Sequence, residues 1–511
     1  MMITTEAFGA YDVRGVYPET INEEIAYRVG RAFPGLFDAH RVAVGHDIRL
    51  SGPSLQAALV RGLTEAGCDV LDIGMCGTEM IYFATGYYEL DGGIMITASH
   101  NPAEYNGLKF VRQGARPISS DDGLLELKRA VEEFGGDDGV TTLSACNKLH
   151  ERPLSAKALS VCLSLALGTS PRGGGKENGG DDPLRLDALG TSPIGGGKGH
   201  VEQRDIMADY VAHMLSYIDV AQLRERAAAG RRLKVVANVG NGAAGAAVAA
   251  LARELPFDMV LVNEEPDGHF PNGVPNPLLP ENREATARVV RETGADVGVA
   301  WDGDFDRCFI FDEQGTCIDG YYLVGFLAAA FLQTHPGAGI IYDPRLTWNT
   351  IELVEQYGGR PIMSRSGHAF IKAKMRETGA LYGGEMSSHH YFRDFYCCDS
   401  GMLPWLLVMS LLAQSDQPLS ALLAERMARY PISGEINSRV ADPAAVLARV
   451  EQRYADGKVT HVDGLSVEYD TWRFNLRRSN TEPLLRLNVE TRGDRALCAA
   501  RTQELLALIR G

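Results

Sequence analysis

The 511-residue sequence predicts an α/β protein that ends in a smaller α+β unit. Short apolar strands alternate with helical patterns of about ten to fifteen residues, which is typical of a mostly parallel sheet with helices on both faces. From about Tyr430 the strands follow one another more closely. At ~150 residues per domain, the length allows three or four such units.

Taken in order, the pattern predicts four groups of elements. The first has strands over 42–44, 69–73 and 93–96 and helices over 53–66 and 122–134. The second has strands over 234–237, 259–262, 296–300 and 308–311 and helices near 210–214 and over 283–293. The third has helices over 321–334, 349–357, 369–378 and 403–412 and strands over 339–342 and 361–364. The last has strands over 466–469, 473–476 and 484–489 and a final helix. The predicted boundaries are 1–145, 201–315, 316–428 and 429–511.

Residues 146–200 are set apart by their composition. Leu-Gly-Thr-Ser-Pro occurs at residues 167 and 189, and each copy runs into three glycines and a lysine. A phosphate-binding loop is the alternative, but the spacing G-x-x-x-x-G-K-[ST] is absent and no clear strand precedes either copy. Two copies are also too few for a solenoid. We therefore predict a flexible insertion rich in Gly, Ser and Pro.

Composition excludes several classes of function. A net charge of −16 disfavours nucleic-acid and anionic-membrane partners. The most apolar stretch, Leu403 to Leu412, has about half the ~20 residues that a membrane span needs. The first ten residues lack a signal-peptide pattern, and nine cysteines without a C-x-x-C pair fit reduced thiols. Cytoplasmic location is the resulting expectation.

The first candidate loop is Thr97-Ala98-Ser99-His100-Asn101-Pro102, which follows the apolar run Gly93–Ile96. Since ligands of open α/β sheets bind at the carboxyl ends of strands, the Ser99 hydroxyl is a candidate nucleophile. Lys109 starts the next apolar run, so its ammonium could reach back toward Ser99. An ordinary strand-end loop with a capping serine is the alternative for this stretch alone.

Three further loops each suit one part of a reaction. Asp302, Asp304 and Asp306 could converge on one hard cation, Mg²⁺ or Ca²⁺. An EF-hand is the rival, with Glu313 at its twelfth position, but Arg307 stands where glycine is needed and the flanks predict strands. The simpler alternative is an acidic turn stabilised by Arg307.

The loop from Glu385 to His390 offers a carboxylate, two hydroxyls and two imidazoles, which suit hydrogen bonds to sugar hydroxyls. The loop Arg477 to Thr481 combines two guanidinium groups with Ser, Asn and Thr, which suits a phosphate dianion. Polar surface turns are the alternative for both. Together, a nucleophile, a metal, a hydroxyl clamp and a phosphate clamp indicate phosphoryl transfer on a phosphosugar.

The motifs TASHNP, DGDFDR, GEMSSHH and RRSNTEP occur in this order, and with them the chain resembles the α-D-phosphohexomutases, most closely the bacterial phosphomannomutases. The resemblance covers nearly everything except about 145–200. It implies four domains around a central cleft, the first three of them similar α/β units with mixed sheets. It also implies interconversion of mannose 6-phosphate and mannose 1-phosphate through a phosphoserine and a hexose 1,6-bisphosphate, which supplies GDP-mannose synthesis.

The resemblance assigns roles to the matching positions. Ser99 would be the phosphoserine and, with Asp302, Asp304 and Asp306, a ligand of Mg²⁺. Lys109 would be the general acid and base, with His100 assisting. The resemblance gives substrate contacts to Tyr11, Arg14, Arg307, Glu385, Ser387, His389, Arg477, Ser479, Asn480 and Thr481. A hexose 1,6-bisphosphate would serve as primer, and the protein would be a monomer or a homodimer.

Three alternatives to this function stay open. Dual phosphoglucomutase and phosphomannomutase activity is the nearest, because mannose and glucose differ in the orientation of one hydroxyl group. A phosphatase activity, with water accepting the phosphoryl group, is a side reaction. If the insertion displaced the first two units, the chain would be a non-catalytic phosphosugar-binding protein.

Overall fold

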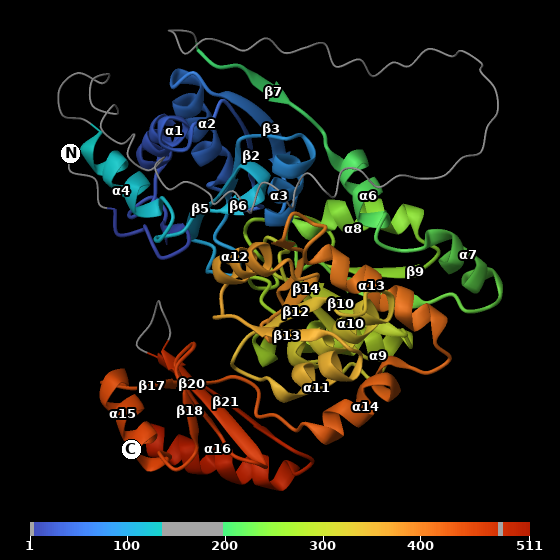
Figure 1. The fold of residues 1–511 in the computed structure, drawn as a ribbon. Coiled ribbons are helices and arrows are strands. Elements are labelled where there is room, and N and C mark those ends of the chain that lie inside the picture. Colours follow the sequence, from blue (N-terminus) through green and yellow to red (C-terminus); the bar gives the residue numbers. More distant parts are fainter. Residues whose placement is uncertain (1–4, 135–197, 479–483) are drawn as a thin grey trace, which may run out of the picture.

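The computed structural model describes residues 5–134, 198–478 and 484–511, which form four α/β units (Figure 1). The predicted insertion lies outside the described residues except for its last three positions. Four sheets organise the chain, one in each unit. The predicted domain boundaries themselves stay a prediction.

The first unit holds a sheet in the order β1-β5-β4-β2-β3-β7, with β6 beside β5. Its elements are β1 (Val13–Val16), α1 (Glu23–Phe37), β2 (Arg41–His46), α2 (Gly52–Glu65), β3 (Asp69–Met75), α3 (Thr78–Tyr87), β4 (Gly92–Ile96), β5 (Tyr105–Arg112), η1 (Gln113–Ala115), β6 (Arg116–Pro117), α4 (Leu124–Glu133) and β7 (Val201–Gln203). The short strand β7 pairs with β3, so residues 201–203 extend the first sheet although the sequence placed them in the second unit.

The second unit has the sheet order β11-β10-β8-β9. Its elements are α6 (Met207–Leu215), α7 (Val220–Ala228), β8 (Lys234–Asn238), α8 (Ala244–Glu254), β9 (Asp258–Val262), η3 (Pro280–Asn282), α9 (Glu284–Thr293), β10 (Val297–Trp301) and β11 (Cys308–Phe311). Every residue of the central strand β10 and of the edge strand β11 is buried, in keeping with their apolar side chains.

The third unit has the sheet order β13-β12-β14-β15-β16. Its elements are α10 (Gly320–Thr334), β12 (Gly339–Tyr342), α11 (Trp348–Gln356), β13 (Arg360–Met363), α12 (His368–Thr378), β14 (Tyr382–Gly384), β15 (His390–Phe392), β16 (Cys398–Asp399), α13 (Met402–Gln414) and α14 (Leu419–Arg429). Within the described ranges no single helix could cross a membrane; only α13 and α14 together, bent by 106°, reach the required length and composition.

The fourth unit is an antiparallel sheet in the order β17-β21-β20-β19-β18, covered by helices. Its elements are β17 (Ile436–Arg439), α15 (Pro443–Arg453), β18 (Lys458–Thr460), β19 (Leu465–Glu468), β20 (Trp472–Arg478), β21 (Leu484–Thr491) and α16 (Arg495–Arg510). Figure 1 shows this unit, in red, beside the third unit and facing the first.

The first three units repeat one topology. In each, three parallel strands are followed by an antiparallel one, in the orders β3-β2-β4-β5, β9-β8-β10-β11 and β13-β12-β14-β15. The connection from the third strand of each set to the antiparallel strand carries Ser99, Asp302–Arg307 and Glu385–His389, respectively. The sheets are therefore less parallel than the alternation predicts, because the chain turns back beside the same strand after each candidate loop.

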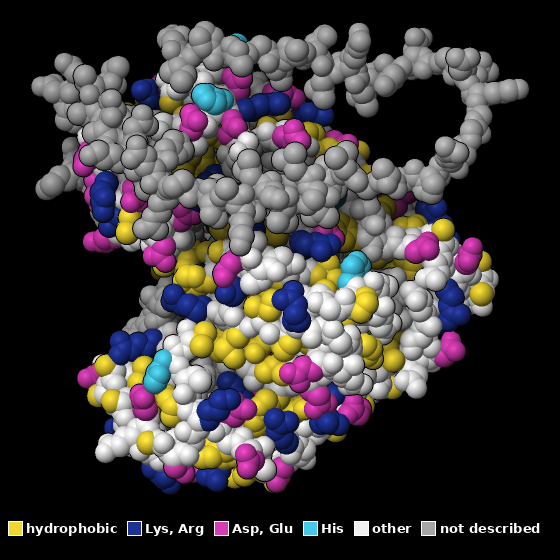
Figure 2. Space-filling model, viewed as in Figure 1, with side chains coloured by type: hydrophobic (Ala, Val, Ile, Leu, Met, Phe, Trp, Pro, Cys, Tyr) yellow, Lys and Arg dark blue, Asp and Glu magenta, His cyan; other side chains and the backbone are white. Residues whose placement is uncertain are grey.

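Apolar packing joins the first three units. One continuous cluster of buried side chains runs from Ala43 in β2 through Trp301 in β10 to Tyr430 after α14. The fourth unit has a core of its own, built around Trp472, Phe474 and Leu505. Figure 2 shows the surface indented at the left, between the first unit above and the fourth below, with acidic and basic side chains interspersed on this face.

Candidate active site

The Ser99 loop holds its serine in a strained backbone conformation. Ser99 follows the fully buried strand β4 and has φ = 50°, in the left-handed region that side chains rarely adopt. Its backbone N–H donates to the Thr97 hydroxyl at 2.8 Å, and this hydroxyl donates to Asp47 at 2.6 Å. These bonds fix the serine where a loop would otherwise relax.

A buried guanidinium completes the support of this loop. Arg49 donates to the carbonyls of Ser99 (2.9 Å), Asn101 (2.7 Å), Pro102 (2.6 Å) and Tyr105 (2.8 Å). Asp47 accepts from the backbone N–H of Arg49 at 2.9 Å and lies 3.3 Å from its guanidinium. Asp47 and Arg49 were not among the site residues predicted from the sequence, although an Asp-x-Arg directly after a strand was a usable signal.

The Asp302–Arg307 loop of the second unit meets Ser99. The Ser99 hydroxyl donates to the Asp302 carboxylate at 2.9 Å. Gly303 allows this approach, because a Cβ there would lie 2.4 Å from the Ser99 carbonyl oxygen. The flanking elements are the strands β10 and β11, and Glu313 bonds to Ser420 instead, so the EF-hand alternative is excluded.

The three aspartates fit a hard cation. One oxygen from each of Asp302, Asp304 and Asp306 lies within 4.8 Å of the others. The Oδ1 atoms of Asp304 and Asp306 are buried without a hydrogen-bond donor, which is rare for carboxylates unless something else binds them. An all-oxygen donor set is what Mg²⁺ prefers.

Lys109 lies against this acidic group. Its ammonium donates to Asp304 and Asp306, both at 2.7 Å. Burial lowers the pKa of Lys109, but the two carboxylates outweigh burial and raise it above its ordinary value. Burial and the neighbouring Asp304 raise the pKa of Asp306 to about 6. As placed, Lys109 holds its proton firmly.

Two histidines flank the reacting positions. The Nδ1 atom of His100 lies 3.0 Å from the Ser99 hydroxyl and also contacts Arg307, whose guanidinium donates to Asp302 at 2.8 Å. Burial and Arg307 hold the pKa of His100 well below its usual range, so this imidazole is neutral. His389, from the third unit, lies 3.0 Å from Asp399 and 3.8 Å from Asp306.

The Glu385 loop is tied to a second Asp-x-Arg. Glu385 accepts from the Tyr391 hydroxyl (2.7 Å), the Gly367 N–H (2.9 Å) and Arg345 (3.1 Å). Arg345 also lies 3.3 Å from the Ser387 hydroxyl and pairs with Asp343 at 2.9 Å. Arg345 follows β12 as Arg49 follows β2, and it too was not among the site residues predicted from the sequence.

Tyr11 and Arg14 lie at two edges of this arrangement. Arg14 donates to the Asn101 side chain at 2.7 Å, beside the Ser99 loop. The Tyr11 ring packs edge-on against His368 and Phe370, with ring centres 5.8 and 5.6 Å apart. Tyr11 thus connects the first unit to the segment of the third that holds Glu385.

Arg477 belongs to a cluster between the third and fourth units. Glu435 accepts from Arg477 at 3.2 Å and from Arg486 at 3.0 Å, and Arg345 lies 3.7 Å away. Burial and the neighbouring Arg345 lower the pKa of Arg477. Ser479, Asn480 and Thr481 lie outside the described residues. Through Arg345, the cluster continues the chain of contacts that begins at Ser99.

Models of one protein family match all four units. The descriptions are phosphoglucomutase/phosphomannomutase alpha/beta/alpha domain I (residues 5–133), domain II (208–315), domain III (319–430) and the C-terminal domain (435–507). The chain belongs to the phosphoglucomutase/phosphomannomutase family. It is therefore an isomerase of the phosphomutase class, and the four-domain fold inferred from the motifs is confirmed.

Full-length relatives carry matching names. A phosphomannomutase of Escherichia coli is 47% identical over 516 residues, covering 100% of both chains. A phosphomannomutase of Salmonella montevideo is 49% identical over 98% of both chains. A Xanthomonas campestris protein named for phosphohexose mutases is 48% identical over 100% of both.

Solved structures agree on the fold. A phosphoglucomutase/phosphomannomutase family protein from Burkholderia thailandensis has a TM-score of 0.78 at 30% identity, covering 100% of this chain and 99% of that one. The open form of a Paramecium phosphoprotein described as a phosphoglucomutase has a TM-score of 0.73 at 16% identity, covering 98% and 94%. At 16% identity the second likeness concerns the fold alone.

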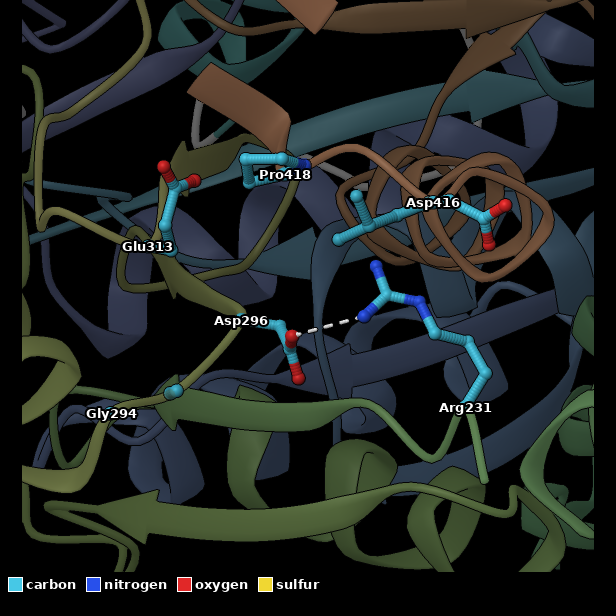
Figure 3. A pocket seen from close by; sticks show the side chains of 8 residues that line it. Arg231, Gly294, Asp296, Glu313, Asp416 and Pro418 are labelled. Carbon is cyan, nitrogen blue, oxygen red and sulfur yellow. Dashed lines mark ion pairs between the residues drawn. The ribbon is translucent and has the colours of Figure 1, made fainter. Parts of the chain in front are cut away.

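A cavity of about 360 Å³ lies away from these phosphomutase loops (Figure 3). It opens at the amino ends of β8 and β10, where Arg231 and Asp296 point toward each other at 3.6 Å. Asp416 and Pro418, between α13 and α14, close its other side. The Asp302–Arg307 loop lies at the opposite, carboxyl end of β10, so the cavity is separate from the candidate active site.

Proposed function

We propose that this family member is a phosphomannomutase, which interconverts mannose 6-phosphate and mannose 1-phosphate through a phosphoserine at Ser99 and a hexose 1,6-bisphosphate, and so supplies GDP-mannose synthesis. The observation that carries the proposal is the 2.9 Å contact between the Ser99 hydroxyl and Asp302, inside a triad of aspartates suited to Mg²⁺. The names of the full-length relatives support mannose as the sugar.

Charge supports the phosphoserine. Around Ser99, three carboxylates face the cationic groups of Lys109 and Arg307. A phosphoryl group would add roughly two negative charges there. Mg²⁺ held by Asp302, Asp304 and Asp306 would supply the positive charge that offsets them.

Each half-reaction moves one phosphoryl group. In the first, the bond between phosphorus and the Ser99 oxygen breaks as a bond to O1 or O6 of the sugar forms; the sugar hydroxyl proton passes to a base, and the freed Ser99 oxygen takes up a proton. In the second, the other phosphoryl group of the bisphosphate returns to the Ser99 oxygen by the reverse steps. His100 would assist at the Ser99 oxygen, which lies 3.0 Å from its Nδ1. Lys109 can act as an acid where it stands, but a role as a base requires it to leave Asp304 and Asp306.

The remaining residues would hold the substrate. Glu385 and Ser387 would bind sugar hydroxyls, since a carboxylate oxygen can accept a further bond beyond those it has. His389 would lie close to the same hydroxyls. Tyr11 and Arg14 would line the entrance, and Arg477, with Ser479, Asn480 and Thr481, would bind the phosphate that does not react. A hexose 1,6-bisphosphate primer, a cytoplasmic location and a monomer or homodimer complete the proposal.

A coupled assay tests the proposal. Purified protein is given mannose 1-phosphate or glucose 1-phosphate with Mg²⁺ and a catalytic amount of hexose 1,6-bisphosphate. We expect Mg²⁺-dependent formation of the 6-phosphates that Ser99→Ala abolishes and Ser216→Ala, at an exposed turn, leaves unchanged. The ratio of the two rates decides between mannose preference and dual specificity, which the family's double name favours as the second candidate. Release of inorganic phosphate instead would indicate a phosphatase, and absence of turnover by folded, primed protein would refute the mutase.

A further inference from the structure

Glu79 places a fully buried carboxylate where the first three units meet. It is the second residue of α3, and its side chain has no exposed surface. The Tyr210 hydroxyl of the second unit donates to one carboxylate oxygen. The backbone N–H groups of Gly401 (2.6 Å) and Met402 (3.1 Å), at the start of α13 in the third unit, donate to the other. Three donors from two other units therefore hold one carboxylate of the first.

Gly401 is fixed from the second unit as well. The Trp301 indole N–H donates to its carbonyl at 2.8 Å, and Trp301 directly precedes Asp302. A Cβ at Gly401 would lie 2.3 Å from the carbonyl oxygen of Phe305, in the middle of the Asp302–Arg307 loop. The start of α13 thus lies directly against the loop that carries the three aspartates.

The neighbours of this junction along the chain are site residues. Thr78, next to Glu79, donates from its hydroxyl to Asp304 at 2.5 Å and from its backbone N–H to the Asp304 carbonyl at 3.0 Å. Asp399, two residues before Gly401, contacts His389 at 3.0 Å. A small shift at Glu79 would therefore reach the loops of two other units.

We propose that Glu79 is a positioning residue for phosphoryl transfer: its carboxylate sets how the Asp302 loop and the His389 loop stand relative to Ser99. The inference rests on the proposed function, since it concerns the same reaction. Glu79 touches neither the aspartates nor Ser99, and it acts through Thr78 and Gly401.

Energetics favour positioning over simple stabilisation. Burying a carboxylate costs free energy that its hydrogen bonds only partly return, and apolar packing would stabilise a junction at least as well. Consistent with this cost, burial raises the pKa of Glu79 to about 7 despite the three donors. The carboxylate instead fixes the relative orientation of the units, because it accepts hydrogen bonds from donors of two other units at once.

The test uses Glu79→Gln, which keeps the side-chain size, and Tyr210→Phe, which removes one donor. We expect kcat of Glu79→Gln to fall by about 10- to 100-fold, the scale of a small misplacement of reacting groups, with KM within about threefold. The kcat of Tyr210→Phe should fall by a smaller factor than that of Glu79→Gln. Amide hydrogen exchange at Gly401 and Met402 should speed up in Glu79→Gln, because their acceptor loses its charge.

Matched variants separate this role from folding. Glu254→Gln, at an exposed position of α8, should leave kcat and exchange unchanged. Glu79→Asp keeps the negative charge on a shorter side chain. Its kcat should fall by about as much as that of Glu79→Gln. If Glu79→Gln loses thermal stability but keeps kcat, the inference is overturned. If the wild-type protein itself isomerises no sugar phosphate, the proposed function has failed, and that outcome is visible before any variant is made.

Discussion

The Ser99 hydroxyl and the Asp302 carboxylate lie 2.9 Å apart across 203 residues of chain. Each belongs to a loop that leaves the carboxyl end of the third parallel strand of its own unit. Two copies of one topology thus face each other with their functional loops in contact. The nucleophile and the candidate metal ligands are brought together by this pairing of units.

Removing a ligand of the candidate cation should lower the affinity of the enzyme for Mg²⁺. We expect Asp304→Asn to raise the Mg²⁺ concentration for half-maximal activity by more than about tenfold. Mutating residues that only hydrogen-bond to metal ligands already lowers metal affinity by about that factor. Titration of the coupled assay with MgCl₂ measures it. Asp416→Asn, whose side chain is 96% exposed, is the control. An unchanged Mg²⁺ requirement in Asp304→Asn would count against the triad as the metal site.

Arg49→Lys should lower kcat while the charge at this position is kept. The single ammonium of lysine cannot donate to all four carbonyls that the guanidinium binds, so the Ser99 loop becomes more mobile. Small displacements of reacting groups lower kcat by up to about 100-fold. Steady-state kinetics beside Arg116→Lys, at an exposed arginine of β6, measure the effect. Equal kcat in the two variants would show that the loop keeps its shape without Arg49.

Arg345→Lys should act mainly on substrate binding. Its guanidinium orders Glu385 and Ser387 together, which a single ammonium does less well. We expect KM for mannose 1-phosphate to rise by roughly tenfold, a loss of about 1.4 kcal/mol, with a smaller change in kcat. A fall in kcat at constant KM would instead place Arg345 in the chemical step.

The buried His390 should make stability depend on pH. Burial lowers its pKa to about 3, with a smaller contribution from His389, and the Tyr382 hydroxyl lies 2.6 Å from its Nδ1. Below the ordinary pKa of about 6.5, the unfolded chain binds a proton that the folded chain refuses, so stability falls as pH drops toward 3. The slope is at most about 1.4 kcal/mol per pH unit.

Denaturant unfolding of the wild type and His390→Asn between pH 8 and pH 4 checks this prediction. The difference between their free energies of unfolding should shrink as pH falls, because asparagine does not titrate. A constant difference for His390→Asn would mean that His390 takes up its proton over the same pH range in the folded protein as in the unfolded chain, and would contradict the prediction.

Much of the site was readable because its loops carry unusual side chains directly after apolar strands. Ser99 and Asp302 were predicted in this way and Glu385 from its place after a Gly-Gly pair, and the structure surrounds them with neighbours such as Lys109 and Arg345. Arg49 and Arg345 were missed because a buried arginine that caps carbonyls looks like any charged loop residue until the chain is folded. Glu79 was missed for the same reason, since its partners Tyr210 and Gly401 lie far away in sequence.

The fold was predictable to the level of unit type. Strand and helix alternation gave the three α/β units, but it did not show the antiparallel return after each loop, because periodicity carries no strand direction. The pairing of β7 with β3 depends on contacts distant in sequence, and local pattern could not place it. The roles of Ser479, Asn480 and Thr481 stay predictions.

The separate core of the fourth unit has a consequence for how the molecule melts. The first three units share one apolar cluster, to which the first adds a second core of its own. The fourth unit instead meets the third through polar contacts such as Glu490 with the Thr347 N–H at 2.7 Å and Arg473 with the Pro344 carbonyl at 2.8 Å. Calorimetry should therefore resolve two cooperative transitions, a large one for three units that unfold together and a small one for the fourth. A sugar phosphate that bridges Arg477 and Glu385 would draw the two heat-absorption peaks together, which makes their separation a readout of ligand binding that needs no turnover.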